Sequence, residues 1–133
     1  MNNTGLIVIF LMTSLSVARA SDVESMLAGY RNDGAAEFSA ERGKLLWTTP
    51  RVFDGGERAC SSCHTTNPAA PGRHIKTGKA IEPIAASANP DRFTDMAKTE
   101  KWFRRNCKWT LGRECTPQEK GDLLTWLGGQ QEN

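Results

Sequence analysis

The apolar residues of this chain recur at helical spacing in three segments, and each segment carries signals for the start and the end of a helix. The first segment begins at Ser39, a preferred N-cap residue, and runs to Trp47 before Pro50 stops it. The second begins at Thr94 or Asp95 and runs to about residue 111, where a glycine supplies the stop. Both segments are therefore predicted to be helices.

The last segment also has a specific start signal. Thr116-Pro117-Gln118-Glu119 matches a capping box with proline at the first helical position. Leu123, Leu124 and Leu127 then share one side of the predicted helix, and Gly128-Gly129 end it. We therefore predict a third helix with one apolar face.

Residues 65–91 interrupt this helical pattern. The stretch holds Pro68, Pro71, Pro83 and Pro90, which exclude a long helix there. A loop of this length in a small domain is normally functional, so we expect it to wrap a buried group. The fold prediction is thus an all-α chain with one long loop that contains proline and glycine.

The N-terminal residues have the pattern of a secretory signal peptide. An apolar run from Leu6 to Met12 is followed by Ala18-Arg19-Ala20, with small residues three and one places before a cut. The run is too short for a bilayer span, which needs about 20 residues. We predict that residues 1–20 are removed and that residues 21–133 form one domain, exported to the periplasm in soluble form without stable membrane insertion.

The charge balance argues against a nucleic-acid-binding protein. Without the leader the chain keeps 16 basic and 15 acidic side chains, a formal net charge of +1, because Arg19 is the one charged residue removed. Such a balance lacks the basic face that nucleic acid requires. A domain of this length is also too small for a large apolar core, and a buried cofactor would add the apolar area that it lacks.

Cys60-Ser61-Ser62-Cys63-His64 is the motif that decides the chemistry. Two thiols at this spacing reach the two vinyl groups of a haem, and the following imidazole then lies under the iron. A zinc site is disfavoured because the other two cysteines do not form a second C-x-x-C pair, and a thioredoxin-like pair lacks its βαβ context. The motif predicts one covalent haem c, with Cys60 and Cys63 attached to it and His64 as an axial iron ligand.

Cys107 and Cys115 remain outside this motif. In an exported protein, an even number of further cysteines favours a disulfide. On the chain-entropy model such a bridge would stabilise the fold by about 2 to 3 kcal/mol. Reactive or regulatory thiols are the alternative.

The iron ligand opposite His64 separates the possible functions. Methionine or histidine gives a closed electron-transfer iron, whereas a weak or absent ligand leaves a place for a small molecule. Met96 is the only methionine after the motif, and His74 is the only other histidine. The remaining plausible donors are Lys98, Lys101 and Asn106.

A helical wheel places Asn106 in the middle of an apolar stripe that contains Trp102, Phe103 and Trp109. The cationic residues of the segment fall on the other side, namely Arg104, Arg105 and Lys108. A buried amide without a partner costs roughly 1 to 3 kcal/mol, so either backbone groups of the core or a haem iron should satisfy Asn106. Met96 lies beside the same stripe, and the wheel leaves it open as a ligand.

From the haem motif to Leu127 the chain resembles the Sphaeroides haem protein family, oxygen-binding cytochromes c, and its relative cytochrome c double-prime. The stretches that carry the resemblance are Thr77-Gly78-Lys79, Ile81-Glu82-Pro83-Ile84-Ala85, Asn89-Pro90-Asp91-Arg92-Phe93-Thr94-Asp95, Glu100-Lys101-Trp102, Arg105-Asn106-Cys107 and Gly112-Arg113-Glu114-Cys115-Thr116-Pro117-Gln118-Glu119-Lys120. The order of elements also resembles the class I cytochrome c fold, in which the first and last helices cross at a glycine. That resemblance assigns the crossing to Gly43, Trp47, Leu123, Leu124 and Leu127.

The family resemblance implies roles for individual residues. In the Sphaeroides haem protein the residue before the first bridge cysteine is an asparagine ligand, here Asn106, whereas cytochrome c double-prime has histidine there. Cys107 and Cys115 match the family's disulfide. Because an amide is a poor ligand for ferrous iron, Asn106 should bind ferric iron and leave on reduction. Dioxygen, nitric oxide or carbon monoxide would then enter a pocket lined by Trp102, Phe103 and Trp109.

Three functions remain. The favoured one is a cytochrome that couples electron transfer to the binding of a small diatomic gas, with a second cytochrome or a membrane protein as electron donor. The alternatives are a plain electron carrier with Met96 or His74 on the iron, and a haem enzyme that acts on peroxide or nitric oxide. Candidates for neutralising the haem propionates, each more typical of a solvated charge, are Arg73, Lys76, Lys79 and Arg92.

Overall fold

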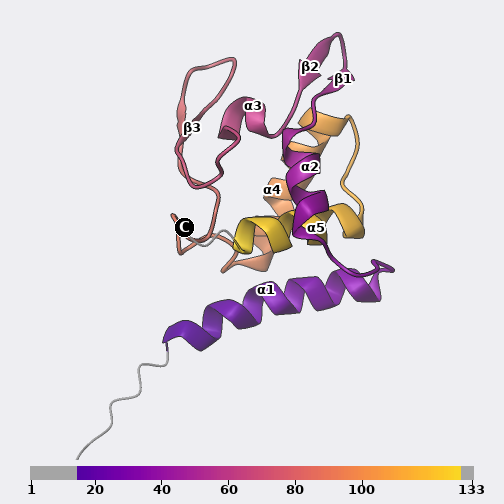
Figure 1. The fold of residues 1–133 in the computed structure, drawn as a ribbon, viewed down its shortest axis with the longest axis vertical. Helices are drawn as coiled ribbons and strands as arrows, with labels where there is room; N and C mark the ends of the chain where they lie inside the picture. Colours follow the sequence, from indigo (N-terminus) through magenta and orange to yellow (C-terminus); the bar gives the residue numbers. More distant parts are fainter. Residues whose placement is uncertain (1–14, 130–133) are drawn as a thin grey trace, which may run out of the picture.

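The structure is a computed structural model that describes residues 15–129, in which five helices are joined by loops and two short antiparallel hairpins (Figure 1). The helices are α1 (Leu15–Asn32), α2 (Ala40–Thr48), α3 (Ser61–His64), α4 (Met96–Leu111) and α5 (Pro117–Gly128). The hairpins pair β1 (Arg51–Phe53) with β2 (Gly56–Arg58) and β3 (Gly72–Arg73) with β4 (Ala80–Ile81). The mostly helical architecture confirms the predicted fold class.

The three predicted helices are α2, α4 and α5, and their ends follow the predicted signals. The Ser39 hydroxyl accepts a hydrogen bond from the backbone N–H of Arg42 at 3.2 Å. Asp95, rather than Thr94, caps α4, and Gly112 ends that helix in the left-handed conformation at φ 72°. The predicted capping box at the start of α5 is present in full. Local sequence therefore determines the ends of these helices.

Two features were not predicted from the sequence. One is α1, which docks Met26, Leu27 and Tyr30 into the core. The other is the pair of hairpins, whose strands are too short for a periodic pattern. Residues 1–14 of the predicted signal peptide lie outside the described residues, and α1 runs through the predicted cut after Ala20.

Helices α2 and α5 cross at the predicted glycine. A Cβ atom built on Gly43 would overlap the carbonyl oxygen of Asp122, so the two backbones touch only because that side chain is absent. The Asp122 carboxylate is buried beside the crossing and accepts hydrogen bonds from the Ser39 backbone N–H at 2.7 Å and from Arg42 Nε at 2.8 Å. Gly43 thus has the predicted role, although α2 is the second helix of the structure.

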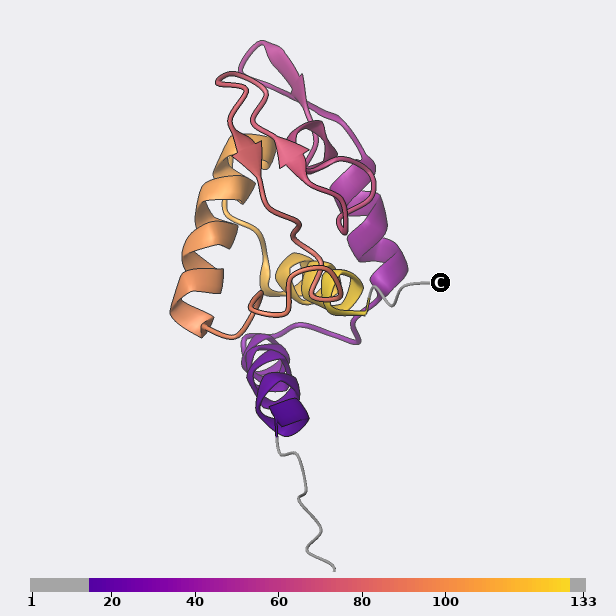
Figure 2. The same ribbon diagram turned by 90° about the vertical axis from the view of Figure 1, so that its left-hand side faces the viewer.

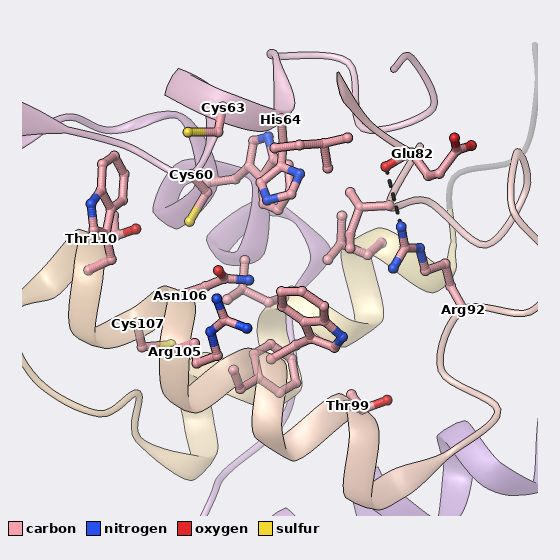
Figure 3. Close-up of a pocket in the computed structure, with 18 of the residues that line it drawn as sticks. Cys60, Cys63, His64, Glu82, Arg92, Thr99, Arg105, Asn106, Cys107 and Thr110 are labelled. Atoms are coloured by element: carbon pink, nitrogen blue, oxygen red, sulfur yellow. Dashed lines mark hydrogen bonds between the residues drawn. The ribbon is translucent and has the colours of Figure 1, made fainter. Parts of the chain in front are cut away.

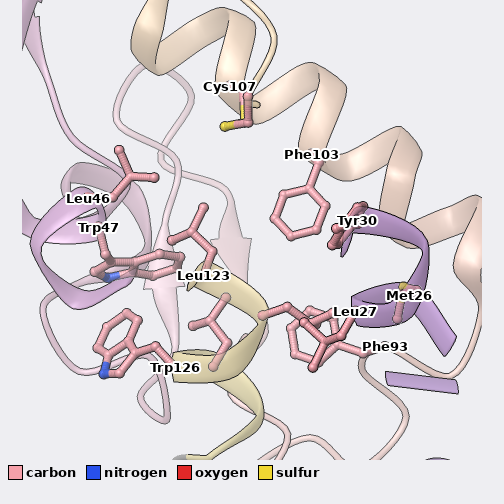
Figure 4. Packing of buried hydrophobic residues seen from close by; sticks show 13 residues of the cluster. Met26, Leu27, Tyr30, Leu46, Trp47, Phe93, Phe103, Cys107, Leu123 and Trp126 are labelled. Carbon is pink, nitrogen blue, oxygen red and sulfur yellow. A yellow bond between two sulfur atoms is a disulfide. The ribbon is translucent and has the colours of Figure 1, made fainter. Parts of the chain in front are cut away.

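The apolar side of α5 faces two different parts of the molecule (Figure 4). Leu124 is fully buried and, with Leu27, lines a small cavity between α1 and α5. Leu123 and Leu127 are buried as well but line a larger cavity on the other side of α5. Trp126 packs edge-on against Trp47, with ring centroids 5.5 Å apart. Helix α5 therefore packs against α1 and α2 and also lines the larger cavity.

In Figure 2, α4 and α2 stand on opposite sides, α5 crosses below, and the hairpins lie above. Residues of α2, α4 and α5 line the larger cavity. Helix α3 sits next to α2, and β3 packs against it. The arrangement thus places α3 across from α4. Among residues 15–129, no helix has both the length and the apolar character needed to cross a membrane.

Candidate haem-binding site

A cavity of about 1000 Å³ lies between α3 and α4 (Figure 3). That volume is at the upper end of the range for small-molecule and cofactor sites, roughly 300 to 1000 Å³. Its lining comes from α2, α3, the loop with β4, α4 and α5. We call the side formed by α2 and α3, with β3 packed on α3, the His64 wall, and the opposite side, formed by α4, the Asn106 wall.

The His64 wall brings the whole predicted haem motif to the cavity. Cys60, Cys63 and His64 all line it, and both cysteines are free thiols. The single turn of α3 places them together, because the backbone N–H of His64 donates to the Cys60 carbonyl at 3.1 Å. Burial raises the pKa of the Cys60 thiol to about 11, so an unattached Cys60 would stay protonated at neutral pH.

Three contacts hold His64 and its neighbours in place. The Trp47 ring lies 5.3 Å from the imidazole centroid, and Trp47 Nε1 donates to the Thr65 carbonyl at 2.8 Å. On the other side, a Cβ atom on Gly72 would overlap the Cys63 carbonyl oxygen, so β3 packs directly on α3. Burial, with a smaller contribution from the Arg92 charge, lowers the pKa of His64. The ring is therefore neutral at physiological pH, as a metal ligand must be.

The Asn106 wall faces this motif with one amide among aromatic rings. Asn106 is half-buried and lines the cavity, with its side chain across from Cys60 and His64 in Figure 3. The predicted pocket residues, namely Trp102, Phe103 and Trp109, also line the cavity. Among residues 15–129 the Asn106 amide makes no hydrogen bond to the protein. The alternative of a core asparagine bonded to backbone therefore finds no support.

A disulfide links the end of α4 next to Asn106 to the segment just before α5. Cys107 and Cys115 form a disulfide with their Cα atoms 5.5 Å apart, and both residues are buried. Trp109 connects the same end of α4 to β2, because its carbonyl accepts a hydrogen bond from Arg58 at 3.1 Å while Arg58 also stacks on its ring. The bridge directly follows the proposed ligand in the sequence and so restrains the turn that carries it.

The other candidate ligands are less well placed. Met96 is the first residue of α4, is 48% exposed and does not line the cavity. It lies ten residues from Asn106, about 15 Å along the helix axis. His74 lines the cavity, but its Nδ1 accepts hydrogen bonds from the backbone N–H groups of Lys76 and Thr77 at 3.3 and 3.2 Å. A neutral ring with that pattern carries its proton on Nε2 and has no free lone pair for iron. Lys98 lines the cavity and Lys101 does not.

Two of the four predicted propionate partners reach the site. Lys79 and Arg92 line the cavity, whereas Arg73 and Lys76 do not. Arg92 Nε donates to the Pro83 carbonyl at 2.9 Å, and burial lowers the pKa of its guanidinium. Arg92 is thus a cation already held in place at the edge of the cavity.

Arg105 is the residue that the helical wheel misplaced. The wheel assigns it to the outer side of α4 with Arg104 and Lys108, and those two indeed reach Glu114, at 3.9 and 3.8 Å. Arg105 instead lines the cavity, and its guanidinium carbon lies 5.0 Å from the Trp102 ring centroid. The position of Trp102 three residues earlier was the available signal, because side chains at that spacing meet on a helix.

The residues present fit a covalent haem. Two thiols and a neutral imidazole share one wall, a single amide donor faces them, and the rest of the lining is largely apolar. Within the described part of the chain, no group of three or more His, Cys, Asp or Glu side chains is placed to hold a bare metal ion. This donor set suits an iron that arrives in its own macrocycle, and it does not suit a zinc site.

Comparisons with known proteins agree with this interpretation. Residues 33–127 match a family described as "Domain of unknown function (DUF1924)". The chain is 41% identical over 128 residues to the cytochrome c-type protein SHP of Cereibacter sphaeroides, which covers 94% of this chain and 97% of SHP. The match to SHP extends over nearly the whole chain.

Two solved structures share the fold. The oxidised form of SHP, described as an oxygen binding cytochrome c, has a TM-score of 0.74 at 44% identity and covers 81% of this chain and 96% of its own. Oxidised cytochrome c'' from Methylophilus methylotrophus has a TM-score of 0.74 at 35% identity and covers 84% of this chain and 97% of its own. The comparisons confirm the resemblance found in the sequence, the class of fold and a covalent haem c as the cofactor.

Proposed function

The chain belongs to the family of the cytochrome c-type protein SHP and cytochrome c'', and from that premise we propose that it is a c-type cytochrome that binds a small diatomic gas. SHP is described as an oxygen binding cytochrome c. The observation in this chain that carries the proposal is the Asn106 amide, which faces the cavity without a hydrogen bond to the protein. Dioxygen, nitric oxide and carbon monoxide are the candidate ligands.

Each wall of the cavity has a distinct task in this proposal. Cys60 and Cys63 would hold the haem through thioether bonds, and His64 would bind the iron on one side. The haem supplies an iron that changes oxidation state and accepts a further ligand opposite His64. Trp102, Phe103 and the rest of the apolar lining would keep water from that position.

Asn106 gives the site its dependence on oxidation state. A neutral amide is a hard, weak donor that ferric iron tolerates and ferrous iron binds poorly. We infer that Asn106 binds the ferric iron and leaves on reduction, so that a gas can take its position. The amide has no protein partner to compete with the iron in the oxidised state, which supports its role as a ligand.

The two alternative functions have less support. A closed electron carrier would need Met96 or His74 on the iron, yet Met96 does not line the cavity and His74 uses Nδ1 in its own turn. An enzyme acting on peroxide or nitric oxide would need an acid–base group over the iron. Asn106 does not titrate, and the Asn106 wall carries no histidine.

Replacement of Asn106 tests the proposal. In the ferric Asn106→Ala protein, water or an added anion should bind the iron, while covalent haem attachment stays intact. In Asn106→His, the switch should slow or lock, because imidazole binds ferrous iron far better than an amide does. Optical spectra of both oxidation states give the readout. Ferric spectra of Asn106→Ala that match those of the wild type would refute Asn106 as the ligand.

Export and electron supply are further parts of the proposal. We propose that the chain is cut after Ala20 and matures in the periplasm, where another cytochrome or a membrane protein reduces it. The intact mass of the mature protein should equal residues 21–133 plus one haem. A haem that acidified ketone extracts would contradict covalent attachment.

A further inference from the structure

The cationic residues in the second half of α4 lie in different surroundings. Arg104 and Lys108 point to the outside of the molecule, where both approach Glu114. Arg105 lies against the Trp102 ring instead and lines the cavity. Figure 3 shows its guanidinium next to the Asn106 side chain, on the side of α4 that faces Cys60 and His64. Arg105 is thus a cation beside the position that Asn106 is proposed to vacate.

The positive charge of Arg105 has no acidic neighbour to neutralise it. Within residues 15–129, Arg105 forms no ion pair. The acidic residues that line the cavity are Glu82, Asp91 and Asp95. Asp95 is ten residues away and caps the other end of α4, about 15 Å along the axis. Glu82 and Asp91 belong to the loop that holds Arg92, whose Nη donates to the Glu82 carbonyl at 3.3 Å. The Asn106 side of the cavity therefore has a net positive charge.

The stacking on Trp102 holds the Arg105 guanidinium in a fixed orientation in which it can bind a ligand. A guanidinium that lies over an aromatic face is held in one plane, and its N–H groups still point outward from the edge. Charge-assisted hydrogen bonds to small anions are strong. A lysine would offer the same charge without the planar set of donors.

We propose that Arg105 is a binding residue of the pocket opposite His64, and that it selects small anions such as azide, cyanide and nitrite over neutral ligands when a ligand displaces the weakly bound Asn106 amide from ferric iron. This inference rests on the proposed function, because it concerns the iron position that Asn106 is proposed to occupy. It extends the proposed function from neutral gases in the reduced state to anions in the oxidised state.

The test uses ferric haem-loaded protein in which Asn106→Ala has opened the iron. Arg105→Gln in that background should weaken azide binding about tenfold or more, which is the size expected for one charge-assisted hydrogen bond. Imidazole, a neutral ligand, should bind within about twofold of the parent. Arg104→Gln is the matched control and should change neither, since Arg104 faces Glu114 outside the cavity. Arg105→Lys should recover part of the azide affinity.

A second measurement keeps the wild-type Asn106. In the reduced protein with carbon monoxide bound, Arg105→Gln should shift the C–O stretching vibration to higher wavenumber, because a nearby cation strengthens donation from iron to the ligand. Arg104→Gln should leave that vibration unchanged. Matching denaturation midpoints for the two variants would show that neither effect comes from misfolding.

The outcomes separate this inference from the proposed function. If Asn106→Ala opens the iron to azide but Arg105→Gln and Arg104→Gln behave alike, the role of Arg105 is refuted and the proposed function stands. Equal losses of azide and imidazole affinity in Arg105→Gln would refute selectivity. If Asn106→Ala does not admit azide at all, both proposals fail together.

Discussion

The two walls of the haem cavity are held in place by different kinds of contact. The His64 wall depends on backbone packing: Gly43 lets α2 touch α5, Gly72 lets β3 touch α3, and Trp47 lies against the imidazole. The two glycine contacts are rigid, because they join backbone atoms and no side-chain rotation can release them. The His64 wall therefore suits a ligand that stays on the iron in both oxidation states.

The Asn106 wall depends on side chains at its two ends. Near its start, Glu100 receives hydrogen bonds from Tyr30 of α1 and from Lys120 of α5, the latter at 2.7 Å. Near its end, the Cys107–Cys115 disulfide ties α4 to α5. Between these ties, Asn106 faces the cavity without a protein partner. We infer from this difference that a permanent ligand and a releasable ligand need different supports, and four variants test it.

The largest expected effect is on the backbone crossing behind the His64 wall. Gly43→Ala places a Cβ atom on the Asp122 carbonyl, and the helices must separate, at a cost of about 3 kcal/mol in the free energy of unfolding. Gly29→Ala is the control, because a Cβ atom there meets nothing within 4 Å, and it should add about 0.5 to 1 kcal/mol. Denaturant titration of both haem-loaded proteins gives the comparison. Equal stability of the two variants would show that α2 and α5 do not need this close approach.

The next effect concerns the disulfide of the Asn106 wall. A Cys107→Ser and Cys115→Ser double variant should lose about 2 to 3 kcal/mol of stability on the chain-entropy model. It should also loosen the turn that carries Asn106, so that azide enters the ferric protein faster than in the wild type. Stopped-flow mixing with azide measures this rate. A loss of stability without faster entry would mean that the bridge supports the fold but not the ligand.

A smaller effect is expected at the other end of α4. Burial alone would raise the pKa of Glu100, but the hydrogen bonds from Lys120 and Tyr30 outweigh it and hold the pKa below its ordinary value. A lowered carboxyl pKa stabilises the fold above the unfolded value of about 4.3, and this contribution is lost as the pH falls through the folded value. Glu100→Gln should therefore cost about 1 kcal/mol at pH 7, since the group is partly exposed and screened.

The pH dependence distinguishes this contact from a surface ion pair. The stability difference between wild type and Glu100→Gln should disappear as the pH falls below about 4. Glu24→Gln serves as the control, because Glu24 and Arg31 form an exposed pair 3.2 Å apart whose loss should cost under about 0.5 kcal/mol. A difference that persists unchanged at low pH would show that the Glu100 charge is not what ties α4 to its neighbours.

The smallest effect is expected at Met96. Met96→Leu keeps the volume of an exposed side chain that does not line the cavity. The spectra of both oxidation states should be unchanged, and stability should change by less than about 0.5 kcal/mol. A change of spin state in this variant would show that Met96, and not Asn106, is the iron ligand opposite His64.

Much of this molecule was predictable because its signals are local. Ser39, Gly112 and the box at Thr116 mark helix ends through hydrogen bonds to residues only a few positions away. The haem motif is local too, since one turn of helix brings its members together. Helix α1 was not predictable in this way, because Met26 and Tyr30 gain their stability from distant segments.

Two errors of the helical wheel have separate physical causes. The wheel left Met96 open beside Asn106 because it ignores distance along the axis, which is about 15 Å here. It placed Arg105 outside because it follows the direction of Cβ, whereas a long flexible side chain can bend back over a neighbouring ring. A sequence argument about a cavity should therefore treat long cations as able to reach either side of a helix.

The spin state of the reduced wild-type protein tests the central claim most directly. If Asn106 is the releasable ligand, the ferric protein is six-coordinate, whereas the ferrous protein is high-spin and binds carbon monoxide rapidly. Optical spectra before and after reduction, followed by carbon monoxide mixing, give the answer in one sample. A ferrous protein that stays low-spin and binds carbon monoxide only slowly would contradict the account and indicate an ordinary electron carrier.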